Sequence, residues 1–174
     1  MSVRQAAVAI VLSPGAASDD LLLIRRATVA GDPWSGHLAL PGGSREPGDP
    51  TLEDTARRET LEETGIDLSQ SARVATLTPV TPSIMTAPAI SIAPFVFRYG
   101  GDRRVTMSCE IVESWWIPVE QLKREDAWVT TPVTIRDGSA IQVRGLLWHG
   151  HVLWGLTEKI IHEFLATMKQ AQSR

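Results

Sequence analysis

Residues 42–66 read GGSREPGDPTLEDTARRETLEETGI, and this stretch carries more information than any other part of the chain. It begins with Gly42 and Gly43 and ends in a segment with three carboxylates, Glu59, Glu62 and Glu63. On an α-helix the offsets i, i+3 and i+4 place all three carboxylates on one face. Like charges at this spacing repel each other, so a helix kept only for structure rarely contains them.

This acidic face predicts a metal site that handles phosphate groups. Hard divalent cations such as Mg²⁺ and Mn²⁺ bind several carboxylate oxygens that converge on one point. A glycine-rich turn before the helix lets phosphate approach the backbone and the helix N-terminus. We therefore expect Glu59, Glu62 and Glu63 to bind Mg²⁺ or Mn²⁺, and Gly42 and Gly43 to lie beside the substrate.

The stretch resembles the Nudix box, which in outline reads Gly, five residues, Glu, seven residues, Arg-Glu, an apolar residue, any residue, Glu-Glu, any residue, Gly and an apolar residue. The matching positions are Gly43, Arg58, Glu59, Glu62, Glu63, Gly65 and Ile66. The resemblance implies a metal-dependent hydrolase that cleaves a diphosphate bond, with Arg58 orienting the glutamates by ion pairing. It also implies an α/β fold, the Nudix-type α/β/α sandwich with a mixed sheet, a catalytic helix after the glycine-rich turn and a long C-terminal helix.

Three positions depart from this outline. Asp49 stands where a glutamate is usual, and eight residues rather than seven separate it from Arg58. These two departures occur together in the coenzyme A diphosphatase-like branch of the family and therefore point to that branch. A charge at the helix N-terminus explains Asp49 at least as well as a catalytic role does. Thr60 replaces an apolar residue, although its methyl group can still pack.

The residues before the box also resemble that branch, in which a Leu-Leu-x-x-Arg segment leads through a further arginine and a glycine into Phe-Pro-Gly-Gly. The chain keeps Leu22, Leu23, Arg26, Gly36, Pro41, Gly42 and Gly43. Leu40 replaces the Phe, and Asp32 stands in place of the second arginine, which removes a charge-assisted contact to phosphate. By resemblance, coenzyme A or an acyl-CoA is the leading substrate.

Other functions stay open at this point. An ADP-ribose or dinucleotide diphosphatase, or a nucleoside triphosphate pyrophosphatase, would use the same acidic helix. A noncatalytic nucleotide-sensing module with the same fold is an alternative of a different class. Loss of a glutamate from the box would favour the sensor, but all three glutamates are present. The sequence therefore favours an enzyme.

Candidate substrate-binding residues lie upstream of the box. Arg25 and Arg26 alternate across a predicted strand, so one of them faces the substrate, and the position in the motif favours Arg26. His37 could donate to phosphate or transfer a proton, and Trp34 could stack on a nucleobase. For both, the alternative is structural: a hydrogen-bonded histidine, and a tryptophan that packs under the glycine turn.

A second acidic pair, Glu110 and Glu113, follows the box at a distance. Nudix enzymes often use an extra ligand or general base from such a loop, and Glu110 has a suitable place for that role. Surface solvation is the alternative for Glu110 and the preferred interpretation of Glu113. The single cysteine, Cys109, lies in a strand-like run, where a buried or half-buried structural thiol is expected.

Composition predicts one globular domain that covers residues 1–174, because 43% of the residues are hydrophobic and only 21% are charged. The resemblance implies that this is a single Nudix hydrolase domain. A net charge of -3 argues against a nucleic-acid partner. One cysteine fits a reducing compartment, and the apolar run over residues 6–12 is too short to span a membrane. We expect a cytoplasmic enzyme that binds a phosphorylated small molecule, with no membrane partner; a homodimer stays open.

Hydrophobic patterns predict the secondary structure. The expected strands are residues 6–12, 21–26, 74–77, 90–97, 111–117, 133–135 and 141–147. The first two are expected to form a hairpin, and the last two a hairpin around Asp137 and Gly138. A capping box of Thr51 and Asp54 starts a helix that ends at Gly65, and residues 151–169 have helical spacing.

Replacing one glutamate of the box tests this interpretation. Glu62→Gln removes the charge of a predicted metal ligand and should lower turnover by orders of magnitude without unfolding the protein. Initial rates with Mg²⁺ or Mn²⁺, together with a thermal melt, measure both effects. A variant with a near-normal rate would remove Glu62 from the ligand set.

Overall fold

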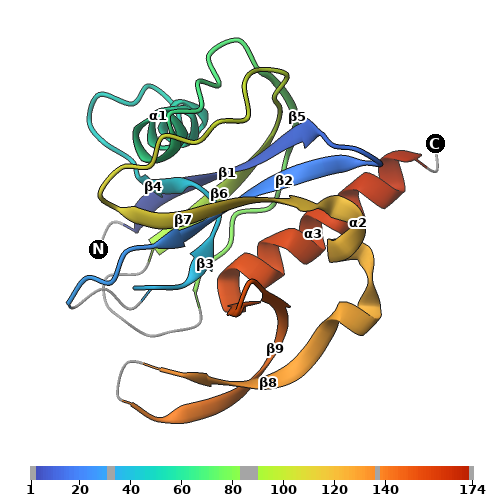
Figure 1. Ribbon diagram of the computed structural model, residues 1–174. Helices are drawn as coiled ribbons and strands as arrows, with labels where there is room; N and C mark the ends of the chain where they lie inside the picture. Colours follow the sequence, from blue (N-terminus) through green and yellow to red (C-terminus); the bar gives the residue numbers. More distant parts are fainter. Residues whose placement is uncertain (1–2, 31–33, 83–89, 136–137, 173–174) are drawn as a thin grey trace.

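The computed structural model describes residues 3–30, 34–82, 90–135 and 138–172 (Figure 1). Two residues used above, Asp32 and Asp137, lie outside these ranges. Within them the chain forms a mixed sheet with α1 on one side and α3 on the other, as Figure 1 shows. The predicted α/β/α arrangement is confirmed.

Seven strands form the central sheet. They are β1 Arg4–Pro14, β2 Asp19–Arg26, β3 Leu38–Ala39, β4 Gly42–Ser44, β5 Ala72–Thr76, β6 Ile90–Arg98 and β7 Ile111–Pro118. The hydrogen-bonded order is β3-β2-β1-β6-β5, with β4 also paired to β1 and β7 also paired to β2. Only the β1–β6 pair of this described sheet is parallel.

The glycine turn lies between two diverging strands of this sheet. β1 and β2 pair only near their shared turn, from Leu12 opposite Leu21 onward, so the predicted hairpin is confirmed. Beyond that point β3 pairs with β2, and β4 pairs with β1. The carbonyl of Pro41 accepts a hydrogen bond from the amide of Ala9 at 2.8 Å. Sheet hydrogen bonds therefore fix the backbone of the turn.

Side chains of β1 alternate between two cores, as expected of a strand buried on both faces. Ala7, Ala9 and Val11 pack in the core beneath α1, together with residues of β6. Ile10 and Leu12 pack in the core that α3 covers. The continuous apolar run over residues 6–12 thus reflects a central strand between two helical layers.

The helix that carries the box is α1, Leu52–Thr64, and both of its predicted ends are confirmed. The Thr51 hydroxyl accepts from the Asp54 amide at 3.2 Å, and the Asp54 carboxylate accepts from the Thr51 amide at 3.0 Å. Gly65 ends the helix with φ of 71°, a left-handed conformation that glycine adopts without strain.

The remaining elements form a second layer. They are α2 Val119–Lys123, η1 Glu125–Ala127, β8 Trp128–Thr134, β9 Ala140–Trp148, β10 His151–Trp154 and α3 Gly155–Gln172. The last three strands form an antiparallel sheet in the order β10-β9-β8. The predicted late hairpin is confirmed, with a longer first strand than expected. No helix in the described part of the chain is long and apolar enough to cross a membrane.

The predicted start of the C-terminal helix was wrong. Residues His151–Trp154 form β10, and the helix begins at Gly155, which has φ of 67°. Leu153, which lies in the range predicted as helix, instead pairs with Leu146 across the small sheet and is fully buried. Four residues are too few for the 2.0 and 3.6 periodicities to be distinguished, and the pairing with β9 is decided by tertiary structure.

The capping box gives a stability prediction. Thr51→Ala should lower the free energy of unfolding by about 1 kcal/mol, because the Asp54 amide loses its acceptor. Thr51→Ser keeps the hydroxyl and should remain within about 0.5 kcal/mol of the wild type. Urea denaturation of the three proteins measures the difference. Equal midpoints for the alanine variant and the wild type would show that the cap contributes nothing.

Candidate active site

Glu63 joins the catalytic helix to the glycine turn. Its side chain is only 3% exposed, and its Oε2 accepts a hydrogen bond from the Gly42 amide at 2.9 Å. Gly42 has φ of 154°, and a Cβ at this position would collide with the Ala7 carbonyl and with Val8 of β1. The site therefore requires glycine here for both conformation and space.

Gly43 lies directly against the second carboxylate. A Cβ on Gly43 would stand 2.5 Å from Oε1 of Glu59, so any side chain would displace that carboxylate. Glu59 is partly buried, whereas the side chain of Glu62 is exposed. The absence of a side chain at position 43 thus lets the Glu59 carboxylate pack directly against the turn backbone.

Arg58 contacts three carboxylates: Asp49, Glu59 and Glu62. Its Nε and Nη2 donate to the two oxygens of Asp49 at 2.9 and 3.0 Å, and Nη2 also donates to the Ser44 carbonyl at 3.1 Å. Its Nη1 lies 3.1 Å from Glu59 and 2.9 Å from Glu62. One guanidinium thus links the turn to the acidic face of α1 through several charge-assisted hydrogen bonds.

Asp49 is a structural partner of Arg58 rather than a member of the acidic face. It is buried, and it also accepts from the Glu46 amide and the Thr55 hydroxyl, each at 2.9 Å. The hydrogen bonds from Arg58 hold the pKa of the Asp49 carboxyl well below its usual value. This geometry supports the helix N-terminal alternative for Asp49.

Thr60, the unusual residue of the box, is fully buried. Its hydroxyl donates to the Ala56 carbonyl one turn earlier at 2.7 Å, so burial leaves the group hydrogen-bonded. Threonine can therefore replace an apolar residue at this position without an unsatisfied polar atom.

Burial makes the ionised forms of Glu59 and Glu63 unfavourable. It raises the pKa of Glu63 to about 7, and the nearby carboxylates of Glu59 and Glu110 add to the shift, while the Gly42 amide and Arg26 oppose it. Burial is also the main reason why the pKa of Glu59 is raised. A site with several such carboxylates would be stabilised by a bound cation.

Two candidates from outside the box approach this site. Nη1 of Arg26 lies 3.9 Å from Oε1 of Glu63. Glu110 lies in an exposed turn before β7, its carbonyl accepts from the Ala27 amide at 2.8 Å, and its charge acts on Glu59 and Glu63. Tertiary structure thus brings Arg26 and Glu110 to the acidic helix.

The other two candidates have evident packing contacts. The ring centroid of His37 lies 5.1 Å from that of Trp154. The backbone amide of His37 donates to the Trp34 carbonyl at 3.3 Å. The His37 carbonyl accepts from the Arg26 amide at 3.1 Å, so this loop borders the site. These contacts favour the structural alternative for His37. Trp34 is partly buried in the same turn.

One expectation from sequence is corrected. Cys109 is exposed in the turn before Glu110, whereas a buried or half-buried thiol in a strand was expected. Glu113 has a side chain that is 40% exposed, and its carboxylate also forms an ion pair with Arg25 and lies 3.1 Å from Nε2 of His151. Sequence could not identify these partners, because they come from β2 and β10, which are distant in the chain.

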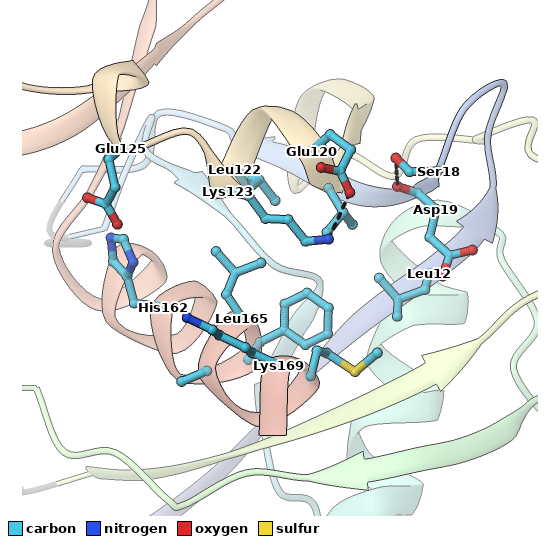
Figure 2. A pocket seen from close by; sticks show the side chains of 14 residues that line it. Leu12, Ser18, Asp19, Glu120, Leu122, Lys123, Glu125, His162, Leu165 and Lys169 are labelled. Carbon is cyan, nitrogen blue, oxygen red and sulfur yellow. Dashed lines mark hydrogen bonds and ion pairs between the residues drawn. The ribbon is translucent and has the colours of Figure 1, made fainter. Parts of the chain in front are cut away.

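The acidic site is separate from the cavity described for this structure. A cavity of 630 Å³ lies elsewhere, between α2, α3 and the turn that joins β1 to β2 (Figure 2), and no residue of α1 or of the glycine turn lines it. Among the described residues, no three His, Cys, Asp or Glu side chains are already grouped as metal ligands. Instead, the three glutamates of the acidic face contact different donors. Arg58 contacts Glu59 and Glu62, and the Gly42 amide donates to Glu63.

Comparison with known sequences identifies a family and several relatives of this chain. The family profile of the NUDIX domain matches residues 3–137. An uncharacterized protein of Schizosaccharomyces pombe is 39% identical over 108 residues, which are 59% of this chain and 32% of that protein. The chain therefore spans about a third of that relative. The uncharacterized Nudix hydrolase NudL of Photorhabdus laumondii is 27% identical over 145 residues, covering 82% of this chain and 74% of that protein.

Solved structures share the fold. A binary complex of Ap4A hydrolase from C. elegans has a TM-score of 0.64 at 18% identity, covering 97% of this chain and 99% of that one. The NUDIX domain of Shewanella oneidensis NrtR, complexed with ADP ribose, has a TM-score of 0.63 at 14% identity and covers 97% and 90% of the two chains. At these identities the likeness concerns the fold alone.

The raised pKa of Glu63 predicts how stability depends on pH in metal-free buffer. Its folded-state pKa of about 7 exceeds the ordinary value of 4.5, so the protonated form stabilises the fold. This stability is fully present below pH 4.5 and is lost as pH rises through 7, a change of up to about 3 kcal/mol. Glu63→Gln should flatten the dependence between pH 5 and pH 8, as urea denaturation can measure.

The matched control is Glu120→Gln, which changes an exposed glutamate far from α1 and should keep the wild-type pH dependence. If the Glu63→Gln protein loses stability with pH as the wild type does, Glu63 is not the titrating group.

Proposed function

The chain belongs to the Nudix family, and from this premise we propose that it is a metal-dependent hydrolase that cleaves the diphosphate bond of nucleoside diphosphate derivatives. The observation that carries the proposal is the position of Glu59, Glu62 and Glu63 on one face of α1, against the glycine turn. Two of these carboxylates are coupled to the turn: Glu63 accepts from Gly42, and Glu59 lies in the space that a side chain on Gly43 would fill.

The residues present fit a hard divalent cation. All donors on this face are carboxylate oxygens, the ligands that Mg²⁺ and Mn²⁺ prefer. A Cβ at position 43 would collide with the Glu59 carboxylate, so glycine keeps this carboxylate against the turn. Burial raises the pKa of Glu59 and Glu63, so a nearby positive charge would be favourable. Glu59, Glu62 and Glu63 would hold the ion, with Glu110 as a further candidate.

The residues of the chain then have distinct tasks. A bound cation supplies charge neutralisation at the diphosphate oxygens and a water of lowered pKa. Arg58 orients Glu59 and Glu62 through its ion pairs, and Asp49 holds Arg58 in place. Arg26 offers positive charge beside Glu63 to a substrate phosphate. Glu110 is the candidate that accepts the proton of the attacking water, since it is exposed and its charge helps to raise the pKa of Glu59 and Glu63.

Coenzyme A or an acyl-CoA is the substrate we propose first. The supporting observations are the Asp49 spacing, the Arg26 motif and the Pro41-Gly42-Gly43 turn. ADP-ribose and dinucleotides are the runner-up class, because they contain the same diphosphate linkage and the fold neighbours include an Ap4A hydrolase and a domain complexed with ADP ribose. Asp32, which replaces a family arginine, argues for testing both classes side by side.

A substrate panel tests this proposal. Purified protein is incubated with Mg²⁺ or Mn²⁺ and with coenzyme A, an acyl-CoA, ADP-ribose, Ap4A or a nucleoside triphosphate, and the products are separated by chromatography. We expect coenzyme A or the acyl-CoA to give the highest kcat/KM and two phosphorylated products, and Glu62→Gln serves as the inactive control. Cleavage of ADP-ribose with coenzyme A untouched would disprove the branch assignment. Metal binding without turnover of any compound would support the noncatalytic sensor.

A further inference from the structure

Glu113 joins three strands from two different sheets. On β7 it pairs directly opposite Arg25 of β2, and its carboxylate accepts a hydrogen bond from Nε of that arginine. The same Oε2 lies 3.1 Å from Nε2 of His151 on β10. The His151 ring also packs against Trp115, with 5.9 Å between ring centroids. One side chain thus ties the central sheet to the small sheet of the second layer.

This contact lies beside an irregularity in strand pairing. Arg25 pairs with Glu113, but the next residue, Arg26, pairs with Ile111, so Val112 is an extra residue in β7. Such a β-bulge changes the direction of neighbouring side chains and is common next to active sites. Val112 is 41% exposed, as expected of a residue left out of the ladder.

Arg26 and Glu110, two candidate residues from outside the box, lie next to this bulge. Arg26, immediately beyond the shift, has Nη1 3.9 Å from Glu63. Glu110 lies in the turn immediately before β7, and its carbonyl accepts from the Ala27 amide at 2.8 Å. Without the extra residue the β7 register would move by one position, and every side chain beyond it would change face.

We propose that Glu113 is a positioning residue: by holding Arg25 and His151 it fixes the bulge between β2 and β7 and so keeps Arg26 directed at the acidic helix. This inference rests on the proposed function. Glu113 acts on the acidic helix indirectly, through Arg26. Arg26 is the residue on β2 that follows Arg25, the strand partner of Glu113.

A positioning role and a merely stabilising role of Glu113 predict different effects on turnover and on stability. The side chains of Glu113, Arg25 and His151 are 40%, 25% and 32% exposed, and ion pairs in contact with solvent contribute little to stability. A displacement of about 1 Å at a catalytic centre, by contrast, can lower turnover about a hundredfold. Loss of Glu113 should therefore affect the rate much more than the melting temperature.

Two variants of Glu113 test the role. Glu113→Ala removes both contacts and should lower kcat about tenfold or more, with the melting temperature within a few degrees of the wild type. Glu113→Gln keeps an oxygen that accepts from Arg25 and should recover most of the rate. Glu120→Ala is the matched control, because it breaks a comparably exposed pair with Lys123 on α2 and should leave kcat unchanged.

A double-mutant cycle tests the route through Arg26. In an Arg26→Ala background, the further change Glu113→Ala should lower kcat by less than about twofold, because the group that it positions is already absent. A wild-type kcat for Glu113→Ala, equal losses in Glu113→Ala and Glu113→Gln, or full additivity in the cycle would each overturn the proposal.

Amide hydrogen exchange keeps this test separate from that of the enzymatic activity. In the substrate-free protein, the Ala27 amide should exchange faster in Glu113→Ala than in the wild type or Glu120→Ala, because its acceptor at Glu110 is no longer fixed. If no substrate is hydrolysed but this difference appears, the proposed function has failed and the positioning of the bulge stands. Unchanged exchange overturns the positioning role whatever the activity.

Discussion

The ion pair between Arg58 and Asp49 is the interaction on which the arrangement of the site depends. It is formed by two charge-assisted hydrogen bonds, and Asp49 is almost fully buried. Asp49 precedes α1 and Arg58 lies in its second turn, so the pair fixes the loop against the helix. From the same guanidinium, the remaining N–H groups contact the Ser44 carbonyl and the carboxylates of Glu59 and Glu62.

A second constraint comes from the sheet. The glycine turn lies between β1 and β2, where these strands diverge, and β3 and β4 use the backbone groups that the divergence leaves unpaired. Hydrogen bonds of the sheet therefore hold the turn, and the Gly42 amide donates to Glu63 from this position. A cation site built on a loop alone would lack this support.

The sequence predicted the catalytic helix well because its signals are local. The capping box of Thr51 and Asp54, the left-handed Gly65 and the spacing of the glutamates all act within one or two helical turns. The other predictions depended on distant contacts. His151 belongs to a strand because β9 lies beside it, and Glu113 is paired because Arg25 and His151 face it. Neither partner could be identified from periodicity.

By itself, the sequence determined which residues form the acidic face and where its helix begins and ends, since helical geometry converts sequence spacing directly into a shared surface. Only the tertiary structure decided which distant groups meet that face. Gly42, Arg26 and Glu110 approach the glutamates from the turn, β2 and the loop before β7. The physical reason is that strand register, including the extra residue at Val112, is set between segments far apart in the chain, and a shift by one residue reverses the face to which a strand side chain such as Arg26 points.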